Sequence, residues 1–367
     1  MPVVSDVRKG GLLAALGTRT RIMLGAAVVA ALLAGVLSLA GAGSVLIFVI
    51  SGAALALLAA LVGEATEQLG TRMGPGATGV LQSALGNLPE LFVGIFALRA
   101  GLIEVVEAAL VGSILGNSLL VLGLAFIVGG LRHGTQVFGA EAPRNMATLT
   151  LLAVAALAVP TLTSGLHTPA AGHEETLSIV CAVVLLAVFA ASIPVALSGG
   201  PISVPKEEPG AQPESWPLAL AVAVLVAAGV GSAFVSDWFV SALTPAMSAL
   251  HLSQAFTGLV VVALAGNAVE NVVGIQLAAR DKIDYAISVI LNSSLQVALG
   301  LIPVLVLLSF VIGGVHLTLV LPALLVAALG LAALLGTVIT YDGKSTWLEG
   351  LALVGLYAML AVAFWWG

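Results

Sequence analysis

The chain has 367 residues, of which 60% are hydrophobic and only 8% are charged, and its mean hydropathy is +1.18. Soluble domains carry about 45–50% apolar and about 25% charged residues, so this balance excludes a soluble enzyme and a disordered chain. The net charge of −6 excludes a basic nucleic-acid-binding surface. The composition instead predicts an all-α polytopic membrane protein, because helices satisfy their own backbone hydrogen bonds in a lipid bilayer and the sequence shows no barrel-type alternation.

A window of about 20 apolar residues, the length that crosses the hydrocarbon core, predicts eleven transmembrane helices. In chain order they cover approximately 22–41, 44–63, 76–98, 103–130, 145–163, 176–198, 216–243, 255–279, 283–313, 318–340 and 347–366. Very short connections such as Gly41-Ala42-Gly43 make neighbouring spans antiparallel. A cleaved signal peptide is the alternative for the first span, although its apolar core is long for that role.

The basic residues predict the orientation of these spans. With a cytoplasmic N-terminus, the cytoplasmic side holds all Lys and Arg residues except Arg99. These residues are Arg8, Lys9, Arg19, Arg21, Arg72, Arg132, Arg144, Lys206, Arg280, Lys282 and Lys344. The positive-inside rule therefore places the N-terminus in the cytoplasm and the C-terminus on the opposite side, in a bacterial inner membrane or a vacuolar one.

The chain divides into four predicted parts. Residues 1–43 hold the N-terminus and one extra helix, and residues 44–198 hold a first group of five helices. Residues 199–215 form a cytoplasmic acidic linker rich in proline, and residues 216–367 hold a second group of five helices. The linker is expected to be a solvated connection, and a cation-sensing role for its acidic residues is the alternative.

The two groups of helices contain an internal repeat. The pattern Gly-Asn-x-x-Glu occurs at Gly86 and again at Gly266, an offset of 266 − 86 = 180. The same offset sets Glu104 opposite Asp284 and Ser113 opposite Ser293. The predicted topology runs the two copies in opposite directions, and such inverted repeats are typical of secondary transporters with an ion site near the midplane.

Two acidic residues lie well inside predicted spans, Glu90 in the first copy and Glu270 in the second. An acidic side chain at the centre of a membrane helix costs a few kcal/mol and indicates a functional site. Asn87 and Asn267 precede these glutamates by three residues, which places amide and carboxylate on one helix face. Gly86 and Gly266 weaken the helices there.

The residue types favour a hard cation such as Ca²⁺, which binds carboxylate, amide and carbonyl oxygens, with Glu90 and Glu270 as its charged ligands. Zinc or copper would favour His or Cys, which these motifs lack. Two nearby carboxylates repel each other and take up protons when no cation is present. A site that holds either Ca²⁺ or protons is the logic of an antiporter, so Ca²⁺ is expected as the transported substrate, with no cofactor.

Further polar residues are candidates for the ion shell, the proton path or the entrance. Additional shell or proton-path residues are Ser113, Asn117, Ser293, Gln296, Gln82 and Asn292, for which interhelical hydrogen bonding is the alternative role. Entrance residues are Glu64, Glu67 and Asp237, for which a solvated or capping role is the alternative. The oligomeric state is left open.

These motifs resemble the cation/proton exchanger family of the calcium:cation antiporter superfamily. The resemblance rests on GEATEQLG, GNLPELFVGIFALRAG and GSILGNSLLVLG in the first half, and on GLVVVALAGNAVENVVGIQLAARDKIDYAISVILNSSLQ in the second. It implies a sodium/calcium exchanger-like fold of one extra helix plus two inverted five-helix repeats, with Glu90 and Glu270 carrying calcium and protons in turn. Asn271 stands where many members carry His, which leaves proton transfer to the carboxylates.

The leading functional hypothesis is secondary active exchange of Ca²⁺, or another divalent cation, for H⁺. The main alternative is exchange of Na⁺ or K⁺ for H⁺, since related superfamily members use similar motifs. An intramembrane enzyme would need catalytic His or paired Asp residues, which these motifs do not supply. A passive channel explains the inverted repeat less directly.

Overall fold

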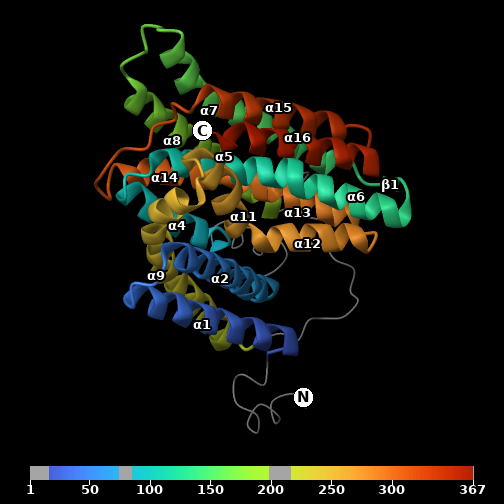
Figure 1. The fold of residues 1–367 in the computed structure, drawn as a ribbon. Helices are drawn as coiled ribbons and strands as arrows, with labels where there is room; N and C mark the ends of the chain where they lie inside the picture. The colour runs from blue at the N-terminus through green and yellow to red at the C-terminus, as the bar shows by residue number, and fades with distance from the viewer. Residues whose placement is uncertain (1–15, 74–84, 198–215, 367) are drawn as a thin grey trace. The chain divides into compact units, whose positions relative to one another are not determined.

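The computed structural model describes residues 16–73, 85–197 and 216–366, and the side chains at 71, 73, 196, 197, 269 and 270 are not among those described. The fold is almost entirely helical (Figure 1). The helices are α1 (Thr18–Leu39), α2 (Ser44–Met73), α4 (Leu88–Arg99), α5 (Ile103–Leu115), η2 (Gly116–Val121), α6 (Leu122–His133), α7 (Glu141–Gly165), α8 (Glu174–Leu197), α9 (Leu218–Leu250), α10 (Gln254–Phe256), η3 (Thr257–Val262), α11 (Ala263–Gly266), α12 (Ala268–Ala279), α13 (Ile283–Gln296), η4 (Val297–Leu301), α14 (Ile302–Ser309), α15 (Ala323–Ile339) and α16 (Trp347–Trp365). The η segments are π-helical turns within longer helices.

In the described part of the chain, eight helices are long and apolar enough to cross a membrane. They correspond in chain order to the predicted spans one, two, four, five, six, seven, nine and eleven. The predicted eighth span is a bent pair, Gln254–Gly266 and Asn271–Ala279, with an angle of 63° between its parts. The tenth corresponds to the 17-residue α15, and part of the third lies outside the described residues. The chain is a multi-pass membrane protein.

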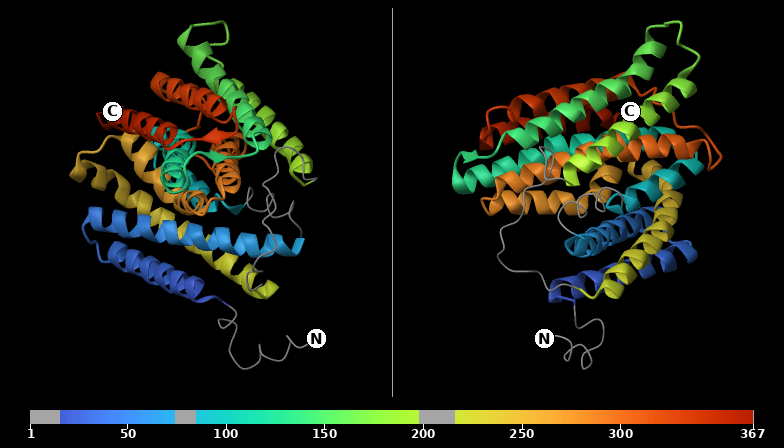
Figure 2. Two further views of the ribbon diagram at one scale, coloured as in Figure 1. Left: turned by 90° about the vertical axis from the view of Figure 1, so that its right-hand side faces the viewer. Right: turned by 180° about the vertical axis from the view of Figure 1, so that it is seen from behind.

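The described residues pack into two units. The first unit, drawn from Met1–Val93 and Lys206–Ala246, contains α1, α2 and most of α9. In this unit α1 and α2 lie side by side (Figures 1 and 2). A β-carbon built on Gly35 of α1 would lie 2.7 Å from the Trp238 ring of α9, so α1 and α9 touch at this glycine. The Phe48 and Phe239 rings stack at 4.9 Å and join α2 to α9.

The second unit, drawn from Gly94–Pro205 and Met247–Gly367, is held together by backbone contact at glycines. A β-carbon on Gly112 of α5 would lie 2.3 Å from the carbonyl oxygen of Leu259 in η3. The reverse contact occurs at Gly258, where a β-carbon would lie 2.4 Å from the carbonyl oxygen of Val105. Small residues at facing positions let membrane helices approach this closely and gain dispersion energy that lipid does not supply.

A short sheet closes one end of the second unit. The two-residue strands β1 (Gln136–Val137) and β2 (Lys344–Ser345) pair antiparallel and join the loop after α6 to the loop before α16. The buried Gln136 side chain also donates to a carboxylate oxygen of Asp281 over 2.8 Å. Thr346 and Glu349 then form a capping box that starts α16.

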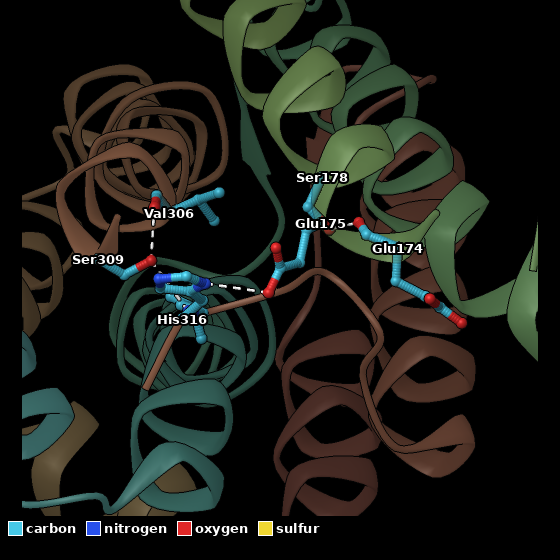
Figure 3. Close-up of polar contacts among 7 residues, drawn as sticks. Glu174, Glu175, Ser178, Val306, Ser309 and His316 are labelled. Carbon is cyan, nitrogen blue, oxygen red and sulfur yellow. Dashed lines mark hydrogen bonds and ion pairs between the residues drawn. The ribbon is translucent and has the colours of Figure 1, made fainter. Parts of the chain in front are cut away.

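The segment between α14 and α15 runs across three helices as an extended strap, residues 310–322. Its backbone N–H groups at Leu317, Leu319 and Leu321 donate, each over 2.9 Å, to hydroxyl oxygens of Ser309, Ser178 and Thr161 respectively. Figure 3 shows Ser178 and Ser309 with the exposed ion pair between His316 Nδ1 and Glu175 Oε1, which are 2.9 Å apart. The buried hydroxyls satisfy backbone groups that would otherwise be orphaned, so they fix the strap.

Candidate functional site

The first acidic motif stands at the beginning of a helix. Gly86 and Asn87 form a turn, and α4 begins directly afterwards at Leu88. The N–H of Leu91 donates to the carbonyl of Asn87 over 2.9 Å, and Glu90 lies in the first turn of α4. Asn87 and Glu90 are half-buried. The partial positive charge of a helix N-terminus stabilises a carboxylate at this position.

The second motif has the same local form. Helix α11 ends at Gly266, Asn267 leaves helical geometry with φ −96° and ψ 18°, and α12 begins at Ala268. The N–H of Asn271 donates to the carbonyl of Asn267 over 3.0 Å. The starts of α4 and α12 are therefore 268 − 88 = 180 residues apart, and both helices have 12 residues. The backbone of Glu270 lies in the first turn of α12, and its side chain is outside the described atoms.

Asn267 is the centre of a buried polar cluster formed by Asn267, Ser113, Asn117 and Ser293, which we call the Asn267 cluster. The amide nitrogen of Asn267 donates to the Ser113 hydroxyl over 2.9 Å and to the carbonyl of Ala263 over 3.0 Å. The amide nitrogen of Asn117 donates to the Ser293 hydroxyl over 2.9 Å, and lies 3.5 Å from the Asn267 amide oxygen. The structure thus brings together four of the predicted residues from three helical segments.

The Asn267 cluster is surrounded by features typical of functional sites. Asn117 lies in the π-helical turn η2, and Ser293 lies one turn before the π-helical turn η4. Turns of this kind are frequent at functional sites because they widen a helix and redirect its carbonyls. The amide oxygen of Asn117 is buried and has no hydrogen-bond partner among the described residues. A buried acceptor of this kind suits a cation or a water molecule.

One neighbouring residue, Ser118, was not among those selected from the sequence, whereas its partner Ser294 was a candidate for the ion shell or the proton path. The hydroxyls of Ser118 and Ser294 lie 3.1 Å apart and continue the polar contact between η2 and α13. The signal available in the sequence was position: Ser118 directly follows the candidate Asn117, just as Ser294 directly follows the candidate Ser293.

The remaining predicted residues are not members of the Asn267 cluster. Gln296 is buried at the end of α13, and Asn292 is half-buried one turn before it. Gln82 falls outside the described residues. Asp237 on α9 is exposed.

The two predicted entrance residues on α2 lie in different environments. Glu67 is exposed, whereas Glu64 is half-buried and accepts a hydrogen bond from the Thr20 hydroxyl of α1. The extra N-terminal helix therefore contacts the carboxylate at this end of α2.

A membrane helix interrupted beside a buried cluster of oxygen-bearing side chains is the architecture of an ion-transporting membrane protein, because the interruption frees backbone groups for the ion. The chain belongs to the sodium/calcium exchanger protein family, whose model matches residues 43–197 and 220–366. This is a family of transporters, not of enzymes, and the resemblance found in the motifs is confirmed.

Two characterised relatives and one solved structure illustrate the similarity. The chain is 38% identical to the Ca²⁺/H⁺ antiporter of Synechocystis sp. (strain ATCC 27184 / PCC 6803 / Kazusa), over 88% of this chain and 92% of the relative. It is 34% identical to the Ca²⁺/H⁺ antiporter of Aphanothece halophytica, over 87% and 89% respectively. The solved structure of native YfkE matches with a TM-score of 0.80 at 30% identity, covering 94% of this chain and 99% of YfkE.

Proposed function

We propose that this protein is a secondary active antiporter that exchanges Ca²⁺ for H⁺ by alternating access. Glu90 and Glu270 bind either the cation or protons in this scheme. Support comes from the relatives, which are named Ca²⁺/H⁺ antiporters and align over almost the whole chain. The family model matches residues 43–197 and 220–366, and these ranges include both motifs.

The observation that carries the proposal is the matched helix start at the two motifs. In each copy a 12-residue helix begins directly after the motif Asn, and the motif Glu lies in its first turn. A helix that starts inside a membrane-spanning segment presents amide, carboxylate and carbonyl oxygens at one point of that segment. This donor set matches the preference of Ca²⁺ for about six to eight oxygen ligands.

The topology proposed with this function has eleven helices, of which the first is extra and the others form two inverted repeats of five. The matching starts of α4 and α12 support the repeat. In this topology the N-terminus is cytoplasmic, and the two motifs enter the membrane from opposite sides. The Asn267 cluster then contributes neutral oxygen atoms near the second motif.

The exchange follows from charge balance at the two carboxylates. Without a cation their mutual repulsion favours protonation, and an arriving Ca²⁺ replaces the protons because it neutralises both charges at once. Proton uptake from one side then releases Ca²⁺ to that side. One site that cannot hold both ions therefore couples their movements in opposite directions.

The test is a transport assay with purified protein in proteoliposomes that hold a pH-sensitive dye and an imposed pH gradient. We expect added Ca²⁺ to collapse the proton gradient. A response to Na⁺ or K⁺ but not to Ca²⁺ would favour the monovalent exchanger and refute the proposal. Calcium flux that leaves an opposing proton gradient intact would indicate a passive channel.

A further inference from the structure

Two buried serines on α9 have no role in the function described so far. Ser232 and Ser236 lie one helical turn apart near the middle of this 33-residue helix, and both are 0% exposed. Neither hydroxyl has a hydrogen-bond partner within the described parts of the chain. Buried polar groups are nearly always hydrogen-bonded, so each exception calls for a physical explanation.

Other buried hydroxyls in the same unit follow the usual pattern. On α2, Ser51 donates to the carbonyl of Ile47 over 2.6 Å, and Thr66 donates to the carbonyl of Val62 over 2.7 Å. A bond to the preceding turn is open to any serine inside a helix. Two serines that lack this bond on one face of one helix therefore indicate a ligand at that face.

This face of α9 meets the helix that carries the first acidic motif. A β-carbon built on Gly229 would lie 3.9 Å from Leu88 Cδ1, which is ordinary van der Waals contact. At about 100° per residue, Ser232 and Ser236 lie within about 60° of Gly229 around the helix axis. Leu88 stands two residues before Glu90, so the serines lie on α9 between its contact with the motif helix at Gly229 and its contact with α2 at Phe239.

The depth of Ser232 matches that of the glutamate. In the proposed topology α9 and the helix bearing Glu90 cross the membrane in the same direction. Measured from the contact between Gly229 and Leu88, Ser232 lies about 4.5 Å and Ser236 about 10.5 Å further along α9, and Glu90 lies about 3 Å further along its own helix. The Ser232 hydroxyl and the Glu90 carboxylate therefore occupy nearly the same level, and Ser236 lies about one turn further along α9.

We propose that Ser232 and Ser236 are cation-positioning residues, whose hydroxyl oxygens bind the transported divalent cation, directly or through one water, on its way along α9 to Glu90. Hydroxyl and water oxygens are suitable ligands for a hard cation that requires several of them. Neutral ligands replace part of the hydration shell and leave the charge exchange to the glutamates. This inference rests on the proposed cation exchange.

The test compares the double variant S232A/S236A with wild type in the proteoliposome assay, with the rate measured against Ca²⁺ concentration. We expect the apparent KM for Ca²⁺ to rise at least threefold with a similar maximal rate. The melting temperature should stay the same or rise, because no hydrogen bond is lost. The matched control is Ser51→Ala, which removes a buried hydroxyl of the same unit that donates to the Ile47 carbonyl of its own helix. This control should leave the KM for Ca²⁺ unchanged.

A KM change below threefold in a folded double variant overturns the proposal, and so does a fall in maximal rate at constant KM, which would assign the serines to helix movement. If the double variant does not fold, the single variants are judged by the same threshold. Failure of the exchange proposal itself is seen separately, in wild-type protein that moves no Ca²⁺. In that case the same KM comparison with Na⁺ tests the serines.

Discussion

Asn117 donates its side-chain N–H to the hydroxyl of Ser293 over 2.9 Å, across a sequence separation of 176 residues. This bond joins η2 to α13, and the bond from Asn267 to Ser113 joins the break before α12 to α5. Two buried amides thus connect helices from both halves of the sequence at one point of the second unit.

Removing one of these amides should weaken the unit and the transport site together. Asn267→Ala deletes the donor to Ser113 and to the Ala263 carbonyl, and we expect a loss of about 1–3 kcal/mol of unfolding free energy with reduced exchange. A fluorescence-based thermal melt in detergent measures the stability. The control Thr148→Ala removes an exposed hydroxyl of α7 and should change stability by less than about 0.5 kcal/mol. Equal melting temperatures for the two variants would contradict this account.

Neutralising either motif glutamate should abolish exchange without unfolding the protein. Glu90→Gln and Glu270→Gln keep the shape of the side chain but remove the charge that Ca²⁺ and protons compete for. Calcium-dependent collapse of the proton gradient is expected to fall to the level of empty vesicles. Glu175→Gln, at an exposed carboxylate paired with His316, should retain full exchange. Substantial flux in a Glu90 or Glu270 variant would remove that residue from the proposed site.

The glycine contact between α5 and η3 should tolerate no added carbon. Gly112→Ala would place a methyl group 2.3 Å from the Leu259 carbonyl oxygen, and backbone cannot move aside as a flexible side chain would. We expect little folded protein, seen as aggregation in size-exclusion chromatography. Gly330→Ala on α15 adds the same methyl group where nothing lies within 4 Å, and it should fold normally. A monodisperse Gly112→Ala variant would show that the two segments can separate.

The strap depends on hydroxyls that bind two groups at once. Ser178 donates to the Glu174 carbonyl over 2.7 Å and accepts from the Leu319 N–H over 2.9 Å. Ser178→Ala leaves that buried N–H without this partner, so we expect a loss of about 1–3 kcal/mol, read as a lower melting temperature. Ser192→Ala, on the same helix, removes a hydroxyl that donates to the Phe189 carbonyl, and it should have a smaller effect. A larger fall in melting temperature for Ser192→Ala than for Ser178→Ala would show that the hydrogen bond from the strap to Ser178 contributes little stability.

The exposed pair between His316 and Glu175 belongs to the same segment but should contribute less than the hydroxyls. Both side chains are exposed, His316 to 42% and Glu175 to 60%, and solvent screening leaves such an ion pair worth about 0–1 kcal/mol. The hydrogen bonds of Ser309, Ser178 and Thr161 to the strap backbone are therefore expected to contribute more to its stability than this pair does.

The sequence by itself determined the membrane character, most span positions and the special local structure at Asn87 and Asn267, after each of which a new helix begins. These features follow from local physics, since hydropathy over about 20 residues and a helix-weakening glycine act along the chain. Only the tertiary structure decided which polar groups meet. The offset of 180 sets Ser113 opposite Ser293, yet Ser113 binds Asn267 and Ser293 binds Asn117, because residues related by a repeat need not touch each other. Packing of distant helices selects such partners, and no local pattern records it.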